Sequence, residues 1–103
     1  MTNERIILLK RIDLLRDGLI RSIGTREFTD YRGRKFSYDI PEDIYTEGAW
    51  RKRGYRIRKG EQARARFPIW KYQIDPDARP YGRTFYMTDM NFFTEDQVVP
   101  ITD

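Results

Sequence analysis

The stretch that decides the fold is WRKRGYRIRKGEQARARFPIWKY, which runs from Trp50 to Tyr72. Apolar and polar residues alternate along it on both sides of the Lys59–Gln62 turn. Because side chains alternate between the two faces of a strand, this spacing is typical of β-structure. The pattern predicts a hairpin with strands at Tyr55–Arg58 and Ala63–Tyr72.

The alternation gives each predicted strand two different faces. The apolar face consists of Tyr55, Ile57, Ala63, Ala65, Phe67 and Ile69. The opposite face consists of arginines and aromatic rings: Arg56, Arg58, Arg64, Arg66, Trp70 and Tyr72. Cations attract phosphates and aromatic rings stack on bases, so this face suits single-stranded nucleic acid.

The length and composition indicate one soluble domain that spans residues 1–103. Charged residues make up 35% of the chain and the mean hydropathy is -0.80. No apolar run approaches the roughly 20 residues that cross a bilayer. Charged residues interrupt the N-terminus, which therefore has no signal-peptide pattern. We expect a cytoplasmic protein with no membrane partner.

The sequence contains neither Cys nor His. Disulfides, zinc sites built from these residues, Ser-His-Asp triads and Cys nucleophiles are therefore excluded. The acidic residues show no spacing typical of a two-metal or glycosidase site, and there is no Gly-rich phosphate loop. We expect no metal, no cofactor and no enzymatic activity.

The basic residues are concentrated in the stretch from Trp50 to Tyr72. The net charge is +4, and Arg51–Lys71 contains nine Lys or Arg residues against one acid, Glu61. Such a single-sign stripe is typical of a protein with a polyanionic partner. The alternative is that these arginines only solvate the outer face of a sheet.

Two helices are predicted outside the hairpin. Asn3–Asp17 has an amphipathic pattern, and Thr46–Arg53 begins at an acceptable N-cap residue, Thr46, and precedes a glycine. We expect Trp50 on the second helix to be a core anchor. The apolar stripe of the first helix, expected to face the core, is Leu8, Ile12, Leu15 and Leu19.

Further β-structure is predicted on both sides. Thr25–Ile40 has the pattern of a hairpin that turns at Asp30–Gly33, and Arg83–Met90 alternates like a strand. Thr94–Gln97 has the form of a capping box, and Gln73–Gly82 is expected to be a mobile loop. The predicted fold is α+β: an antiparallel sheet of four to five strands, with the N-terminal amphipathic helix and one or two short helices on one face.

At this point the chain resembles a known family, the N-terminal domain of ArdC-type antirestriction proteins, in the small stand-alone form carried by phages and mobile elements. The resemblance covers about Leu8 to Ile101 and rests on the order of these residues: Trp50, Gly54-Tyr55, Ile57, Lys59-Gly60-Glu61, Ala63, Ile69-Trp70-Lys71, Phe92-Phe93 and Gln97-Val98. It implies a domain that binds single-stranded DNA. Longer family members add a zinc-peptidase-like region. Because the chain has no His, the resemblance implies the binding half only.

The leading prediction is a non-enzymatic module that binds single-stranded DNA or RNA with little sequence preference. The residues expected to neutralise phosphates are Arg56, Arg58, Arg64, Arg66 and Lys71, and those expected to stack on bases are Trp70, Tyr72 and Tyr86. The alternative is an antirestriction or anti-CRISPR inhibitor that binds a host defence nuclease or its nucleic acid. A third possibility is that the exposed arginines have no dedicated ligand.

Overall fold

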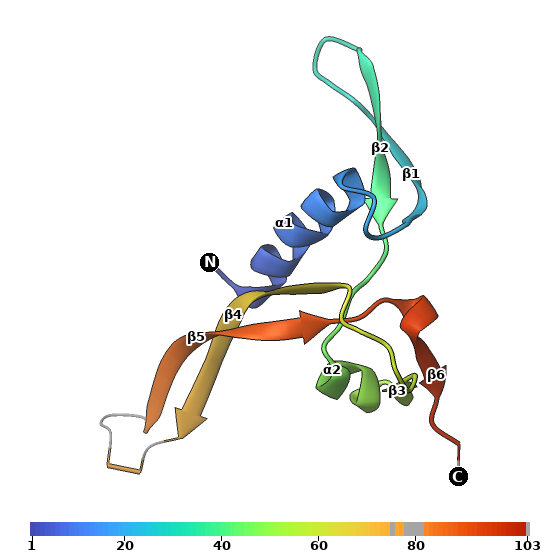
Figure 1. Ribbon diagram of the computed structural model, residues 1–103. Coiled ribbons are helices and arrows are strands. Elements are labelled where there is room, and N and C mark those ends of the chain that lie inside the picture. Colours follow the sequence, from blue (N-terminus) through green and yellow to red (C-terminus); the bar gives the residue numbers. More distant parts are fainter. Residues whose placement is uncertain (75, 78–81, 103) are drawn as a thin grey trace.

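The computed structural model describes residues 1–74, 76–77 and 82–102. The predicted loop Gln73–Gly82 lies partly outside these residues. The fold is α+β, as the sequence predicts, with an N-terminal helix and a short second helix (Figure 1). Its elements in chain order are α1 (Asn3–Arg16), β1 (Ser22–Thr29), β2 (Lys35–Pro41), α2 (Glu47–Lys52), β3 (Tyr55–Ile57), β4 (Ala65–Ile74), β5 (Arg83–Phe92), a 3-10 helix (Glu95–Gln97) and β6 (Val98–Pro100).

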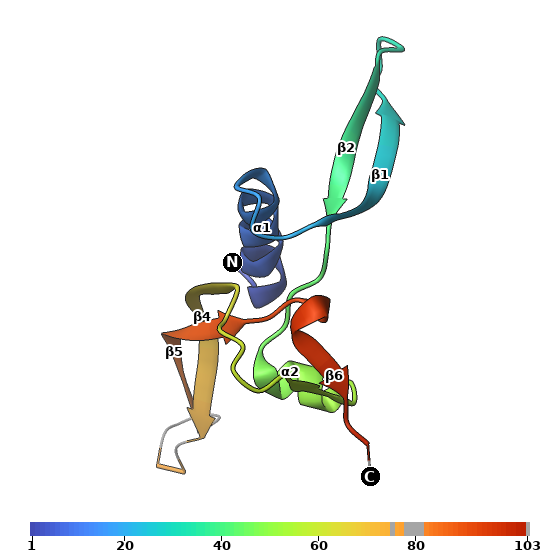
Figure 2. The same cartoon turned by 45° about the vertical axis from the view of Figure 1, so that its right-hand side comes forward.

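The strands are divided among small ladders instead of forming one sheet. In the described part of the chain, β1 pairs with β2, β3 with β6, and β4 with β5, each time antiparallel. The β1–β2 hairpin projects from one side of the molecule, and the curved β4–β5 ribbon extends from another (Figures 1 and 2). The radius of gyration is 17.6 Å, against about 13 Å for a compact chain of this length. The molecule is therefore a small core with two projecting arms.

The predicted hairpin of Tyr55–Arg58 with Ala63–Tyr72 is wrong. The turn forms, with Gly60 at a φ of 87° that favours glycine, but the strands beside it pair elsewhere. The side-chain amide of Gln97 donates to the carbonyl of Gln62 at 2.6 Å and holds the turn against the 3-10 helix. β3 therefore meets β6, a partner about forty residues later that no local pattern reveals.

Helix α1 begins at Asn3 as predicted and ends at Arg16, one residue before the predicted end, but it presents a different face to the core. The Thr2 hydroxyl caps its start, and Gly18 follows its end at a φ of 76°. The guanidinium of Arg11 donates to the carbonyls of Pro41 and Glu42 at 2.6 and 3.0 Å, which fixes the rotation of the helix. The residues packed inward are Ile6, Ile7, Leu14 and Leu15. Of the predicted stripe, only Leu15 packs there; Leu8, Ile12 and Leu19 are 46%, 48% and 48% exposed.

The predicted hairpin at Thr25–Ile40 is confirmed as β1–β2. Asp30 closes its turn by accepting the N–H groups of Arg32 and Arg34 at 2.9 and 2.8 Å, together with the Arg34 guanidinium. Partial burial pushes the pKa of the Asp30 carboxyl upward, but the hydrogen bonds from Arg34 and Arg32 outweigh it, so this pKa lies below its ordinary value. The hairpin is therefore fastened at its tip by local contacts.

Two apolar clusters form the core. The first lies under α1 and consists of Ile20, Ile44, Phe67, Ile69 and Phe92. The second lies beside α2 and consists of Trp50, Phe93 and Val98. The consecutive Phe92 and Phe93 thus enter different clusters, as expected for neighbours on a strand. The predicted apolar face of β4 is confirmed, since Phe67 and Ile69 are each 5% exposed. Within the described residues, no helix has both the length and the apolar character needed to cross a membrane.

Candidate nucleic-acid interface

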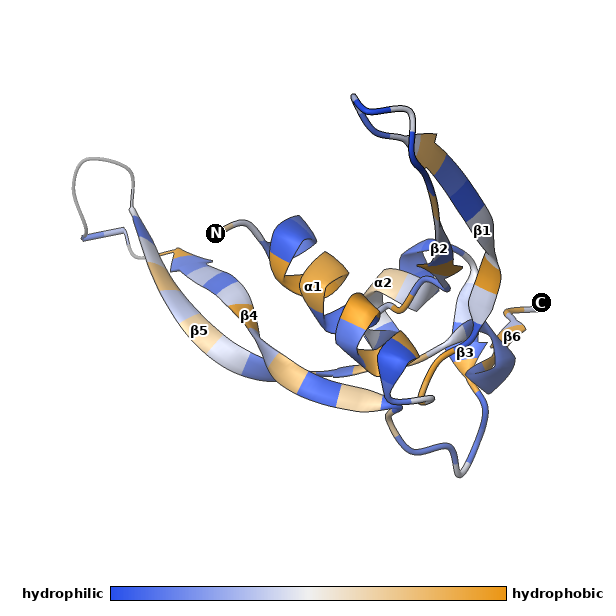
Figure 3. Cartoon of the chain, turned by 90° about the horizontal axis from the view of Figure 1, so that it is seen from above, coloured by the Kyte–Doolittle hydropathy of each residue, from blue (hydrophilic) through white to orange (hydrophobic). Residues whose placement is uncertain are grey.

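The β4–β5 ribbon has an exposed aromatic face that continues along both strands. Cross-strand partners are fixed by the register, which places Trp70 opposite Met87 and Tyr72 opposite Phe85. Apolar and polar residues alternate along both strands (Figure 3). We name the side turned away from the core the outer face. It consists of Arg66, Pro68, Trp70, Tyr72 and Ile74 from β4 and Arg83, Phe85, Met87, Asp89 and Asn91 from β5.

The aromatic rings of the outer face are open to solvent. Trp70, Tyr72 and Phe85 are 42%, 53% and 61% exposed. The rings of Tyr72 and Phe85 lie 6.0 Å apart at 53°, so neither covers the face of the other. The guanidinium carbon of Arg83 lies 5.1 Å from the centre of the Tyr72 ring. This row of rings with a cation beside it is the arrangement on which single-stranded bases stack.

The position of Trp70 is fixed by the first residue of α1. The Asn3 side-chain oxygen accepts the Trp70 N–H at 2.7 Å, and its side-chain amide donates to the Trp70 carbonyl at 2.9 Å. Helix α1 therefore holds the backbone of β4 at this residue. The indole ring is placed on the outer face before any ligand arrives.

Lys71 and Tyr86 do not lie on the outer face. They are opposite each other in the register and share the side of the ribbon that carries the buried Phe67 and Ile69. The sequence predicts the alternation along each strand but not which residues of β5 face Trp70. In their place the structure brings Phe85 and Met87 beside Trp70 and Tyr72. The register of the two strands is the signal that the sequence lacks.

Arg56 and Arg58 are exposed, but they belong to another part of the fold. Arg56 pairs with Val99 in the β3–β6 ladder, and the N–H of Arg58 donates to the carbonyl of Gln97 at 2.9 Å. The predicted continuous arginine face is therefore divided between two ladders, because the hairpin that would have joined them does not form.

Arg64 and Arg66 already have acidic partners. Arg64 is half-buried, and its Nη2 lies 3.5 Å from the Asp96 carboxylate. Its Nε atom is buried without a hydrogen-bond partner among the described residues. The Nε of Arg66 lies 3.7 Å from Oδ2 of Asp89, and this pair is exposed. An exposed pair of this kind contributes about 0–1 kcal/mol, so Arg66 is the one of the two that exchanges its partner for a phosphate at little cost.

The ion pair of Arg64 predicts a pH dependence of stability. The Thr94 hydroxyl donates to Asp96 and the Arg64 guanidinium attracts it, so the pKa of the Asp96 carboxyl lies below its ordinary value despite partial burial. A lowered pKa in the folded state stabilises the protein above about pH 4 and stops doing so as pH falls through the folded value. The free energy of unfolding in urea should therefore fall less for Asp96→Asn than for the native protein between neutral pH and about pH 2. Equal losses would show that Asp96 does not contribute.

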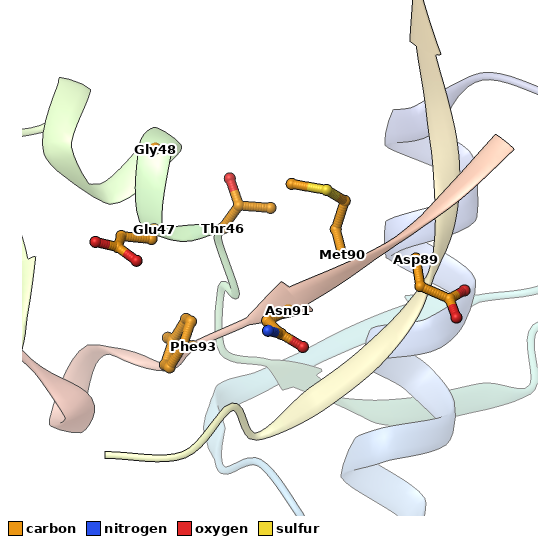
Figure 4. A pocket seen from close by; sticks show the side chains of 7 residues that line it. All are labelled: Thr46, Glu47, Gly48, Asp89, Met90, Asn91 and Phe93. Carbon is orange, nitrogen blue, oxygen red and sulfur yellow. The ribbon is translucent and has the colours of Figure 1, made fainter. Parts of the chain in front are cut away.

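A pocket of about 240 Å³ lies between the start of α2 and the end of β5. Met90 reaches across it toward Thr46, and the carboxylates of Glu47 and Asp89 lie at its opposite ends (Figure 4). Its described lining includes two acids and no basic side chain. The pocket therefore does not extend the outer face as a phosphate-binding surface.

Comparison of the chain with known protein families, characterised proteins and solved structures gave no match. The resemblance to the ArdC-type N-terminal domain therefore stays a prediction from the sequence. The geometry of the outer face must support any functional conclusion by itself.

Proposed function

We propose that this protein binds single-stranded nucleic acid, with little sequence preference, on the outer face of the β4–β5 ribbon. The observation that supports the proposal is the row of exposed rings formed by Trp70, Tyr72 and Phe85, beside the basic Arg66 and Arg83. Soluble monomers rarely leave large apolar side chains together in water without a binding role.

The same geometry favours single strands over duplexes. Bases in a duplex are stacked inside the helix, where rings that project from a ribbon do not reach them, whereas every unpaired base has an open π-face. Trp70 and Tyr72 lie two residues apart on one strand, and Phe85 lies across from Tyr72. Stacking on rings arranged in this way does not read base edges, so we expect a weak sequence preference and acceptance of both DNA and RNA.

Fluorescence anisotropy with labelled single-stranded DNA, double-stranded DNA and single-stranded RNA tests the proposal. The outer face offers Arg66 and Arg83, and Arg64 directly precedes β4. If two to three phosphates are engaged, the slope of log affinity against log salt should be about -1.4 to -2.1 for single strands. Tighter binding to the duplex, or a slope near zero, would contradict the proposal.

A matched control comes from the β3–β6 ladder. If all the predicted basic residues met the same strand, four to six phosphates would give a slope of roughly -3 to -4. Since Arg56 and Arg58 lie on the β3–β6 side, the double variant Arg56→Gln, Arg58→Gln should keep the native slope. A shallower slope in this variant would mean that the nucleic acid also contacts that ladder.

A further inference from the structure

The β1–β2 hairpin has little support from the rest of the chain. Every residue of β1 is exposed, and β2 becomes buried only at Pro41. In the described part of the chain, neither strand pairs with any other. A two-stranded hairpin without a packing partner is marginally stable in water. The hairpin therefore needs a surface to cover one of its faces.

One face of the hairpin is apolar and aromatic. The register places Phe28 opposite Phe36 and Arg26 opposite Tyr38, so these side chains share a face. The other face carries polar pairs such as Glu27 with Ser37. Phe28, Phe36 and Tyr38 are 50%, 42% and 48% exposed. The face that needs cover is the aromatic one.

Two rings of this face are stacked on each other, which leaves them less open ring surface for a nucleobase. Phe28 and Phe36 stack on each other with centres 5.2 Å apart and planes at 18°, and Tyr38 tilts onto Phe28 at 6.1 Å. Phe28 and Phe36 thus cover part of each other's ring face, and the guanidinium carbon of Arg34 lies 5.7 Å from the centre of the Phe36 ring. The ring pair on the outer face of β4–β5, Tyr72 with Phe85, is tilted like Phe28 with Tyr38 and is not stacked.

Helix α1 supplies a second uncovered apolar surface. Leu8 and Ile12, one turn apart on the helix, are each nearly half exposed, because the contacts of Arg11 rotate other residues of the helix into the core. We name this set the α1 stripe. The same chain therefore carries two apolar surfaces that water still contacts, one on the hairpin and one on the helix.

The exposed area matches what a dimer needs. The chain exposes 8245 Å², whereas a compact monomer of 12.5 kDa is expected to expose about 6,200 Å². The excess is about 2,000 Å², and a stable interface needs about 800 Å² from each partner. Burial of part of this excess against a second copy would bring the accessible area of each chain closer to that of an ordinary globular protein of its mass.

We propose that a second copy of this chain covers the hairpin. In this dimer the aromatic face of one hairpin packs on the α1 stripe of the partner, and the two-fold axis repeats the contact, so both surfaces are buried in both chains. The inference goes beyond nucleic-acid binding. It uses none of the outer-face residues of β4–β5, so either proposal can fail without the other.

The mass of the native protein in solution is the first test. Sedimentation equilibrium without nucleic acid, over a wide range of protein concentration, should give twice the chain mass of 12.5 kDa. Phe36→Ser and Ile12→Glu, which alter the two surfaces separately, should each weaken the dimer at least tenfold. Ser37→Lys, on the polar face of the same hairpin and opposite Glu27, should leave the mass unchanged, with circular dichroism confirming that every variant is folded.

The absence of cysteine allows a direct test of the contact. A double variant with Ile12→Cys and Tyr38→Cys should form a disulfide-linked dimer under mild oxidation. A non-reducing denaturing gel should show this dimer directly. A native protein that stays monomeric at every concentration would overturn the proposal. The proposal would also be overturned if the hairpin variants stayed dimeric. The same holds if these variants lost nucleic-acid affinity while the native protein was monomeric.

Discussion

Replacing Trp50 with alanine is expected to destabilise the protein by about 3–5 kcal/mol, the usual cost of removing a buried aromatic side chain. The indole is 5% exposed and lies between Tyr45 and Tyr55, with ring centres 5.0 and 5.5 Å away. It joins α2 to the C-terminal part of the chain, because its Nε1 donates to the carbonyl of Phe93 at 3.0 Å. Urea unfolding followed by circular dichroism measures the loss.

A conservative variant separates packing from hydrogen bonding. Trp50→Phe keeps most of the apolar contact but removes the Nε1 donor. The Phe93 carbonyl would still accept the Tyr45 N–H at 3.1 Å, so we expect the hydrogen bond itself to account for only about 1 kcal/mol. The alanine variant should therefore be clearly less stable than the phenylalanine variant. Equal stabilities would show that packing around Trp50 contributes little.

Replacing Trp70 with alanine is expected to weaken binding of single-stranded nucleic acid by about 1–3 kcal/mol, or roughly 5- to 150-fold, while the fold stays intact. The ring is 42% exposed, and the contacts with Asn3 use only the backbone of Trp70, so they survive the substitution. Anisotropy at low salt gives the affinity, and urea unfolding of the same variant checks its stability.

The ribbon offers a matched control on its other side. Tyr86 is 44% exposed, about as much as Trp70, but it lies opposite Lys71 on the side that faces the core. Tyr86→Ala should therefore keep near-native affinity, whereas Phe85→Ala, one position earlier, should weaken binding. The reverse result would place the nucleic acid on the opposite side of the ribbon from the one proposed.

The features that the sequence predicts well are those set by near neighbours. The caps of α1 and α2, the turn at Asp30 and the buried Trp50 all depend on residues a few positions apart or on one large apolar side chain. Local hydrogen bonds and burial decide such features, so a single sequence contains the necessary information.

The features that the sequence misses depend on distant partners. β3 is short enough to pair with either β4 or β6, and the side chain of Gln97 favours β6. The position of Tyr86 likewise depends on register, since one residue of slip moves every side chain to the other face. On β4, Arg66, Trp70 and Tyr72 share one face as the alternation predicts, whereas Arg64 lies just before the strand and Arg56 and Arg58 belong to another part of the fold.

The contact between Asn3 and Trp70 also protects the edge of a sheet. Exposed strand edges invite pairing with other chains, and proteins block them with covering groups or prolines. Asn3 occupies both the N–H and the carbonyl of Trp70, as a neighbouring strand would. Two residues earlier, at a position with the same orientation, Pro68 has no N–H to offer. The edge of β4 that faces away from β5 is thus blocked at Trp70 and Pro68, which disfavours the addition of another strand there while the aromatic rings stay exposed to water.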